Sequence, residues 1–331
     1  MQTRFAVVVL ALLAAPARAE IVQPPEHSGP DMEDPAREPG PSLPAHWQAA
    51  LQTIRQDPPP PALIRNSHYI ISNEDRPHAF RAVLEDRGGI YIGVGSEQNY
   101  LLAGWARPEL IFLVDFDQLV VDLHRVYRVL MREAPDPQAF LDLWKPEQED
   151  RVRALLAAAY PGDPSVLRAY RRCRFSVPAR LHKMRRILSE AGVPSFLDDP
   201  AQYRYLASMQ HAGRVIALRG DLTGAHTLRD IAAAARATEQ PVRVIYLSNA
   251  ERYFPYGANF KANIQALPFD EHSLVLRTAA RLMNQYVYIV QDGMAFQAWL
   301  RRPDIQRVWQ ITRLRDRNPA GEADYIRRLP H

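Results

Sequence analysis

A glycine-containing turn after an apolar segment is the first feature of this sequence that could bind a ligand. The apolar run Ile90 to Val94 contains Gly93 and is followed by Gly95 and Ser96. Glycine allows a sharp turn and lets the backbone come close to a bound molecule. A helix that begins directly after such a turn offers free N–H groups and a partial positive charge. Strand, Gly-x-Gly turn and helix start together are typical of a nucleotide-binding site.

A carboxylate lies at a suitable distance further along the chain. Asp115 follows the apolar run Leu110 to Val114 and stands twenty residues after Gly95. At the end of a second strand, a carboxylate can accept hydrogen bonds from both hydroxyls of a ribose. A Gly-x-Gly turn alone also occurs where it serves only packing, so the pair is the stronger signal. The sequence therefore predicts a crevice for a small ligand, with a nucleoside-containing molecule as a candidate.

A second polar segment follows a later apolar run. It reads Leu247-Ser248-Asn249-Ala250-Glu251-Arg252-Tyr253. If this segment is extended, the side chains of Asn249, Glu251 and Tyr253 point to one side, into a crevice at the end of a parallel strand. Glu251 is then a candidate general base and Tyr253 a candidate positioning donor. The alternative is that all three only cap the strand end and bond at the surface.

The elements that must position these residues alternate as in a doubly wound α/β fold. We expect strands over residues 90–94, 110–114, 214–218, 242–247, 273–278 and 286–290, and a short extended piece over 68–72. We expect helices over residues 76–86, 96–106, 119–132, 228–237, 260–266 and 295–301. This alternation predicts a mainly parallel sheet with right-handed crossovers. Residues 136–212 contain no convincing strand, so the sequence predicts a helical insertion there.

The N-terminal residues have the pattern of a secretory signal peptide over residues 1–19. Arg4 precedes an apolar run over residues 5–15, and Ala17-Arg18-Ala19 offers small residues to a signal peptidase. We therefore expect an exported protein, periplasmic or secreted, with an uncleaved anchor as the alternative. Residues 20–62 are rich in proline and acidic residues and predict a disordered spacer, interrupted by a short helix over 46–55. The folded domain is expected over residues 63–331.

Charge and cysteine content exclude several classes of partner. The net charge is +4, and Arg4 and Arg18 of the predicted signal peptide supply two of these charges. Such a weak charge does not favour a nucleic acid as partner. No later segment is apolar over the length that a transmembrane helix needs. Cys173 is the only cysteine, and no set of cysteines and histidines has the spacing of a zinc site. A small molecule remains the expected ligand.

The segment IYIGVGSEQNYLLAGWARPELIFLVDFDQ resembles the first two motifs of class I S-adenosylmethionine (SAM) methyltransferases. The chain is more closely similar to a family of uncharacterised bacterial proteins with a methyltransferase-like, Rossmann-type fold. The resemblance rests on the Gly-Val-Gly-x-x-Gln-Asn turn, the second strand that ends in Asp115, and the segment Leu247 to Tyr253. It implies SAM as a cofactor and an acceptor pocket near Glu251 and Tyr253. Its implied cofactor-binding residues are Gly93, Gly95, Gln98, Asn99, Asp115, Asp221 and Asn249.

Asp221 enters this set through Arg219-Gly220-Asp221, which resembles a third methyltransferase motif whose aspartate contacts the adenine amino group. Two positions depart from the family pattern. Tyr91 stands where an acidic residue is usual, and Glu97 stands where the third glycine is usual. A carboxylate at a helix start opposes an anionic ligand but suits an amino group. The two departures thus favour a changed ligand.

Three functional hypotheses follow. In the first, an exported protein of unknown specific activity keeps the methyltransferase-like fold and binds a small ligand in the crevice at the strand C-termini, with a nucleoside-containing molecule as one candidate. In the second, the chain is an active SAM-dependent methyltransferase. In the third, it is a non-enzymatic binding or interaction protein of the periplasm. A nicotinamide-dependent oxidoreductase is less favoured, because Gln98 and Asn99 stand where the Gly-x-G-x-x-Gly pattern needs a glycine.

Overall fold

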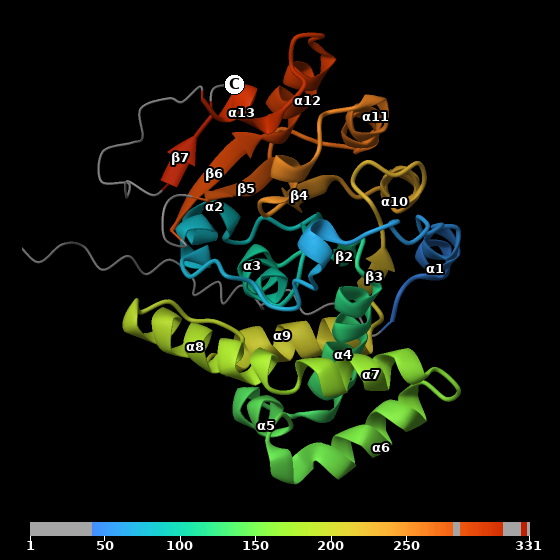
Figure 1. Ribbon diagram of the computed structural model, residues 1–331, viewed down its shortest axis with the longest axis vertical. Coiled ribbons are helices and arrows are strands. Elements are labelled where there is room, and N and C mark those ends of the chain that lie inside the picture. Colours follow the sequence, from blue (N-terminus) through green and yellow to red (C-terminus); the bar gives the residue numbers. More distant parts are fainter. Residues whose placement is uncertain (1–41, 281–284, 314–325, 330–331) are drawn as a thin grey trace, which may run out of the picture. The chain divides into compact units, whose positions relative to one another are not determined.

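The computed structural model describes residues 42–280, 285–313 and 326–329 (Figure 1). All of them belong to the unit formed by residues 37–331. The signal peptide predicted over residues 1–19 and the first part of the predicted spacer lie outside the described residues. Within the described ranges, no helix combines the length and the apolar character that crossing a membrane requires.

A seven-stranded, mostly parallel sheet forms the centre of this unit. The strands lie in the order β3-β2-β1-β4-β5-β6-β7. β1 to β5 are parallel, whereas β6 pairs antiparallel with β5 and β7 pairs parallel with β6. The strands are β1 (Ile90–Val94), β2 (Leu110–Asp115), β3 (Val215–Arg219), β4 (Val242–Tyr246), β5 (Leu274–Ala280), β6 (Tyr286–Asp292) and β7 (Ile326–Arg328). The predicted α/β class and mainly parallel sheet are therefore confirmed.

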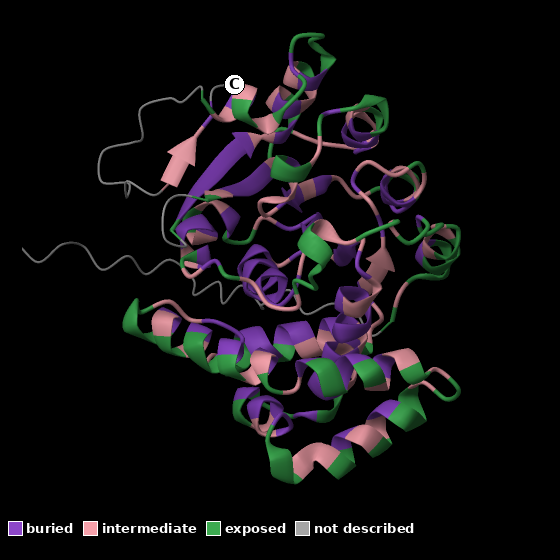
Figure 2. Cartoon of the chain, viewed as in Figure 1, coloured by how far each residue is buried: buried purple, intermediate pink, exposed green. Residues whose placement is uncertain are grey.

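Helices cover both faces of the sheet, which explains why its central strands are continuously apolar. On β2, Ile111 and Leu113 face one hydrophobic cluster, while Phe112 and Val114 face the other. β2 is buried along its whole length, and β1 and β4 are buried except at one residue each. Figure 2 shows buried strands of the sheet in purple. The first cluster includes α3 (Gln98–Ala106), α4 (Gln118–Glu133) and the insertion. The second includes α1 (Ala45–Gln52), α10 (Thr227–Ala237), α11 (Ala258–Ala266) and α12 (Gly293–Arg301).

The segment predicted as a helical insertion forms helices between α4 and β3. These are α5 (Pro137–Asp142), η3 (Pro146–Gln148), α6 (Glu149–Ala159), α7 (Pro164–Cys173), α8 (Ser176–Glu190) and α9 (Pro200–His211). Three of them begin with the same Asp-Pro pair, at Asp136, Asp163 and Asp199. Each aspartate accepts a hydrogen bond from a backbone N–H of the first turn, and proline suits the first helical position because its φ is fixed.

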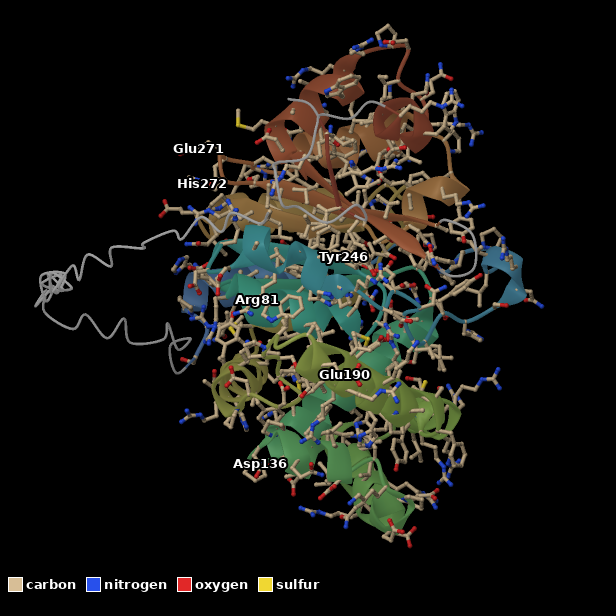
Figure 3. The ribbon with its side chains drawn as sticks, turned by 90° about the vertical axis from the view of Figure 1, so that its left-hand side faces the viewer. Arg81, Asp136, Glu190, Tyr246, Glu271 and His272 are labelled. Atoms are coloured by element: carbon tan, nitrogen blue, oxygen red, sulfur yellow. The ribbon has the colours of Figure 1, made fainter. Side chains whose placement is uncertain are left out.

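The insertion packs on the sheet domain through α4, which contacts α7 and α9. Figure 3 shows this arrangement from the side: Asp136 and Glu190 lie in the insertion, and Tyr246 lies at the end of β4. Cys173 of α7 is buried, and burial raises the pKa of its thiol to about 12. It is therefore a packing residue, as the sequence suggests for a lone cysteine.

The remaining short elements differ from the sequence-based prediction. Residues 68–72 form no strand, and the helix expected over 76–86 is shorter and divided into η2 (Pro77–Phe80) and α2 (Arg81–Leu84). It ends early because Asp86, Gly88 and Gly89 have φ values of 50°, 66° and 65°, which no helix accommodates. The sequence did not predict η1 (Ile64–Asn66), η4 (Ala250–Tyr253), α13 (Val308–Thr312) or β7.

Residues 42–62 of the predicted spacer pack against the sheet domain. α1 lies on α10, and its Trp47 is buried. Asp57, in the proline-rich segment, is buried beside the N-terminus of α10 and accepts hydrogen bonds from the backbone N–H groups of His226 (2.9 Å) and Thr227 (3.3 Å). Because these N–H groups have no partner inside the helix, Asp57 acts as its N-cap from a distant part of the chain.

We expect Asp57→Ala to lower the free energy of unfolding by about 1–3 kcal/mol, since the buried N–H groups of the α10 start lose their acceptor. Urea titration followed by circular dichroism measures the change. Asp57→Asn keeps one acceptor oxygen and should recover part of the loss. Glu85→Ala, at an exposed position, is the control. Equal stability of Asp57→Ala and the unaltered chain would contradict the capping role.

Candidate functional site

Two adjoining cavities open at the carboxyl ends of the central strands. The first has a volume of about 280 Å³ and reaches from Gly95 and Gln98 to Asn249 and Tyr286. The second has a volume of about 260 Å³ and extends toward β3 and Asp221. The two share the wall residues Ile64, Val94, Asp115, Phe116, Ala250 and Tyr253. We call them together the switch-point crevice.

The sheet topology places this crevice where ligands commonly bind in α/β proteins. From β1 the chain continues outward to β2 and β3, whereas β4 lies on the other side of β1 and leads to β5. Loops leaving β1 and β4 therefore separate and leave a gap between them, at the topological switch point. Val94 at the end of β1 lines both cavities.

Asp115 is the acidic residue that both cavities share. Its carboxyl group is buried, and Oδ1 accepts a hydrogen bond of 2.9 Å from the backbone N–H of Asp117. Backbone N–H groups of Gly95 and Phe116 also stabilise its charged form, but burial outweighs them and raises the pKa of Asp115 to about 7. A raised pKa in a crevice is typical of functional carboxyl groups.

The glycine turn is built by side chains that lie beneath it. The Asn99 amide donates hydrogen bonds to the carbonyls of Val94 (3.2 Å) and Ser96 (3.1 Å), and accepts one from the Tyr91 hydroxyl (2.8 Å). A Cβ atom at Gly93 would lie 2.0 Å from Asn99 Oδ1. Gly93 therefore leaves room for Asn99, and both residues support the turn from below without lining either cavity.

Gly95 itself lines the first cavity, and its φ of 93° requires glycine. His124 Nε2, from α4, lies 2.8 Å from the carbonyl oxygen of Gly95. The Tyr100 hydroxyl lies 3.0 Å from His124 Nδ1. A carbonyl only accepts, so Nε2 carries the proton and Nδ1 accepts from Tyr100. Burial lowers the pKa of His124 to about 4, which keeps the ring neutral. This positioning role was not predicted from the sequence.

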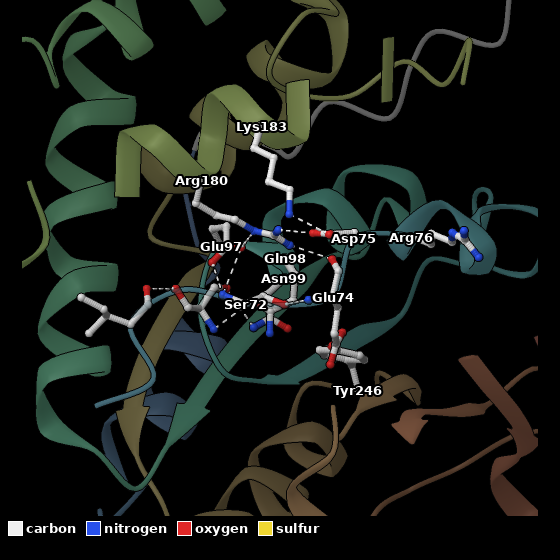
Figure 4. A network of polar contacts seen from close by, with 12 residues as sticks. Ser72, Glu74, Asp75, Arg76, Glu97, Gln98, Asn99, Arg180, Lys183 and Tyr246 are labelled. Carbon is white, nitrogen blue, oxygen red and sulfur yellow. Dashed lines mark hydrogen bonds and ion pairs between the residues drawn. The ribbon is translucent and has the colours of Figure 1, made fainter. Parts of the chain in front are cut away.

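Glu97 and Tyr91, the two departures from the methyltransferase pattern, line neither cavity. Glu97 is buried and forms an ion pair of 2.8 Å with Arg180 Nε from α8. It also accepts from the backbone N–H of Ser72 (3.0 Å). The Arg180 guanidinium also donates hydrogen bonds to Asp75 Oδ1 (2.6 Å) and to the Glu74 carbonyl (2.7 Å), as Figure 4 shows. The Glu97 carboxylate is thus directed toward the insertion and away from the switch-point crevice.

Glu74 links residues 72–75 to the sheet through hydrogen bonds. Its buried carboxyl group accepts hydrogen bonds from the hydroxyls of Tyr246, Ser248 (2.7 Å) and Thr278 (2.7 Å). Burial raises the pKa of Glu74. Because Tyr246 and Thr278 belong to β4 and β5, Glu74 holds residues 72–75 across the ends of both strands. Ser72 and Asn73 of this segment line the first cavity.

The segment after β4 is not extended, so the predicted common direction of its polar side chains is wrong. Ser248 has a φ of 50°, and residues 250–253 form η4. Asn249 lines the first cavity and Tyr253 lines both. Glu251 points elsewhere: it is buried, forms an ion pair of 2.6 Å with Arg277 Nε and accepts from the Tyr256 hydroxyl.

Of the residues predicted from the sequence, six line the crevice. Gly95, Gln98, Asp115, Asn249 and Tyr253 meet in the first cavity, and Asp221 joins Asp115 and Tyr253 in the second. Asp221 Oδ1 also accepts from the backbone N–H and hydroxyl of Thr223. Gly93, Asn99 and Glu251 lie outside. The described part of the chain contains no group of three or more His, Cys, Asp or Glu side chains suited to a metal ion.

Sequence reasoning missed the segment that closes the crevice from the N-terminal side. Pro60, Pro61 and Ala62 line the second cavity, Tyr69 and Ile71 line the first, and Ile64 lines both. This segment has no regular periodicity, and the sequence predicts a spacer over its first part, residues 60–62. The hydrogen bond of 2.6 Å from the Ser96 hydroxyl to the Ile70 carbonyl holds it against the glycine turn.

A family model matches residues 69–328, which include the whole sheet and the insertion. The match begins at Tyr69, so α1 and the Asp57 cap lie before it. No curated protein matches the chain. The chain belongs to the family described as the domain of unknown function DUF7790.

Proposed function

We propose that the switch-point crevice binds a small nucleoside-containing molecule, and that SAM is the first candidate. The observation that carries this proposal is the position of Asp115, whose carboxyl group lies in the wall shared by both cavities. A ribose placed there donates both hydroxyls to the carboxylate, while the groups on its two sides occupy one cavity each. The export signal expected from the sequence remains part of the proposal.

The two cavities offer different surroundings, which suits a ligand with different ends. The second cavity is lined by Pro60, Pro61, Phe116 and Leu222, and Asp221 is its further carboxylate. Such walls suit a planar base whose amino group donates a hydrogen bond. The first cavity offers the Gly95 turn, Gln98, Asn249 and Ser72, which suit the polar amino-acid end of SAM.

A second candidate function is ligand binding without catalysis. The ion pair between Glu251 and Arg277 favours it, because this pair holds Glu251, the predicted general base, outside the crevice. Tyr253 is then the predicted catalytic residue that still lines the cavities. Methyl transfer and simple binding share the same ligand contacts, so the first test addresses binding.

Calorimetric titration of the chain from Glu20 onward with SAM, S-adenosylhomocysteine and adenosine tests the proposal. We expect micromolar binding of at least one of them, because the crevice is preformed and carries a buried carboxylate. NAD is the control for the nicotinamide alternative, and circular dichroism checks that the chain is folded. A folded chain that binds none of the three at millimolar concentration would overturn the proposal. Transfer of a labelled methyl group from SAM would separate the enzyme from the binding protein.

A further inference from the structure

A third cavity lies beside the first and has a different chemical character. Its volume is about 330 Å³, and the cavities share Ser248, Asn249, Arg252 and Ala280. Its other walls come from β5, β6 and the start of α13. Three arginines line it, namely Arg252, Arg277 and Arg307. Glu251 is its one acidic wall residue within the described ranges.

The positive charge of this cavity exceeds its negative charge. Glu251 is paired with Arg277, so these two charges offset each other. Arg252 and Arg307 are exposed, and among the described residues neither forms a salt bridge with a carboxylate. Asp304, on the loop before Arg307, is paired with Arg302 at 2.8 Å. Within the described residues, two guanidinium groups without a carboxylate partner therefore line the same cavity.

The inner wall is rigid. Arg277 is 1% exposed and is held by Glu251 (2.6 Å), by Gln291 Oε1 (2.7 Å) and by the ring of Phe296, which lies 4.6 Å from its guanidinium carbon. Its buried Nη2 has no hydrogen-bond acceptor among the described residues. Glu251 thus positions an arginine, and one buried N–H donor of this arginine is left without an acceptor among the described residues.

The remaining walls suit an organic ligand and not a bare ion. Trp309 is 47% exposed at the rim, and Val308 and Ile289 add apolar surface. Ser248 and Thr278 use their hydroxyl hydrogens on Glu74, so they present oxygen lone pairs only. An aromatic or aliphatic body fits between such walls while its charged end meets the guanidinium groups.

We propose that this third cavity binds a small organic anion, with a carboxylate or phosphate group at Arg252 and Arg307 and an apolar body against Trp309. Guanidinium groups recognise both kinds of anion through paired hydrogen bonds. If the third cavity is the site of a second ligand beside the nucleoside, that role rests on the proposed function. The anion site itself can be tested without it.

The test uses benzoate and phenyl phosphate as probes, with benzamide as the neutral analogue of benzoate. Titrations of the chain from Glu20 onward, followed by Trp fluorescence and by calorimetry, should show saturable binding of one or both anions and no binding of benzamide. The preferred anion identifies the group, a carboxylate or a phosphate monoester. Arg307→Gln should weaken the binding of the anion about tenfold, since one charge-assisted contact is lost. Arg153→Gln, on the surface of α6, is the matched control and should change nothing.

Trp309→Ala gives an independent reading, because it should weaken phenyl phosphate and leave inorganic phosphate unchanged. Equal binding of benzamide and benzoate, or unchanged affinity in Arg307→Gln, would overturn the inference. Arg307 lines neither cavity of the switch-point crevice, so Arg307→Gln should leave SAM affinity unaltered. Absence of binding of SAM, S-adenosylhomocysteine and adenosine, together with retained anion binding, would overturn the proposed function alone.

Discussion

We expect Asp115→Asn to abolish nucleoside binding and, at pH 8, to raise the melting temperature by about 2–4 °C. Two ribose hydroxyls that donate to a carboxylate contribute most of their binding free energy because the acceptor is charged. A neutral amide at this position removes that contribution. Hydrogen bonds to a charged group contribute about 1.5–3 kcal/mol each. The affinity should therefore fall at least about a hundredfold.

The gain in stability follows from the pKa of Asp115. Burial raises it to about 7 in the folded chain, whereas an unfolded aspartate has a pKa of about 3.9. Between these values the folded chain binds more protons than the unfolded chain, so stability decreases as the pH rises. The contribution of Asp115 is fully present below about pH 4 and is lost as the pH passes through 7. Asparagine stays neutral, and its carbonyl can still accept from Asp117 N–H.

The magnitude is modest because the asparagine NH2 group is a donor and cannot accept the hydrogen bonds that the backbone N–H groups donate at this site. The difference between the folded and unfolded pKa values of Asp115 corresponds to a loss of about 4 kcal/mol in the free energy of unfolding at high pH. Recovery of about 1 kcal/mol by asparagine already gives the expected change in melting temperature. Thermal melts from pH 4.5 to pH 8.5 measure the pH dependence, and calorimetry measures the affinity. Asp150→Asn, at an exposed position of α6, is the control. A variant that is less stable at every pH would show that Asp115 serves the fold.

The sequence predicted the regular part of the fold well because both faces of the sheet are buried. Continuous apolar runs such as 110–114, rich in β-branched residues and bounded by turn signals, favour a central strand. The six strands expected between residues 90 and 290 all have counterparts in the structure. β7 has only three residues, two of them arginines, and no such run marks it. Its position depends on pairing with β6 and not on its own composition.

The geometry of the candidate site was predicted where one residue decides its own conformation. Gly95 requires a positive φ, and Asp115 ends a buried strand, so local sequence suffices for both. Glu97 faces Arg180, which is distant along the chain, and no local pattern reveals such a partner. Likewise, Ser248 adopts a φ of 50°, which turns Glu251 out of the crevice. Long-range contacts and single backbone angles therefore decided which residues line the cavities.

The ion pair between Glu97 and Arg180 gives the second large prediction. Arg180→Met leaves the buried Glu97 carboxylate without its partner and should lower the free energy of unfolding by about 3–5 kcal/mol. Glu97→Gln should cost less, because Arg180 keeps its ion pair of 2.6 Å with Asp75. The two side chains are 2% and 4% exposed, so water cannot replace the missing partner. In the double variant both charges are absent, and most of the loss should be recovered. Urea titrations of the four chains give the coupling energy.

A matched control lies on the same helix. Arg186 and Glu190 of α8 are 3.9 Å apart with side chains 70% and 71% exposed, and their cycle should show a coupling of at most about 0.5 kcal/mol. Additive losses at Glu97 and Arg180 would contradict a specific pair. Ligand affinity adds a second reading, because Glu97 also binds the backbone of Ser72, which lines the first cavity. If the glutamate at the usual glycine position holds that wall in place, Glu97→Gln weakens nucleoside binding although residue 97 never meets the ligand.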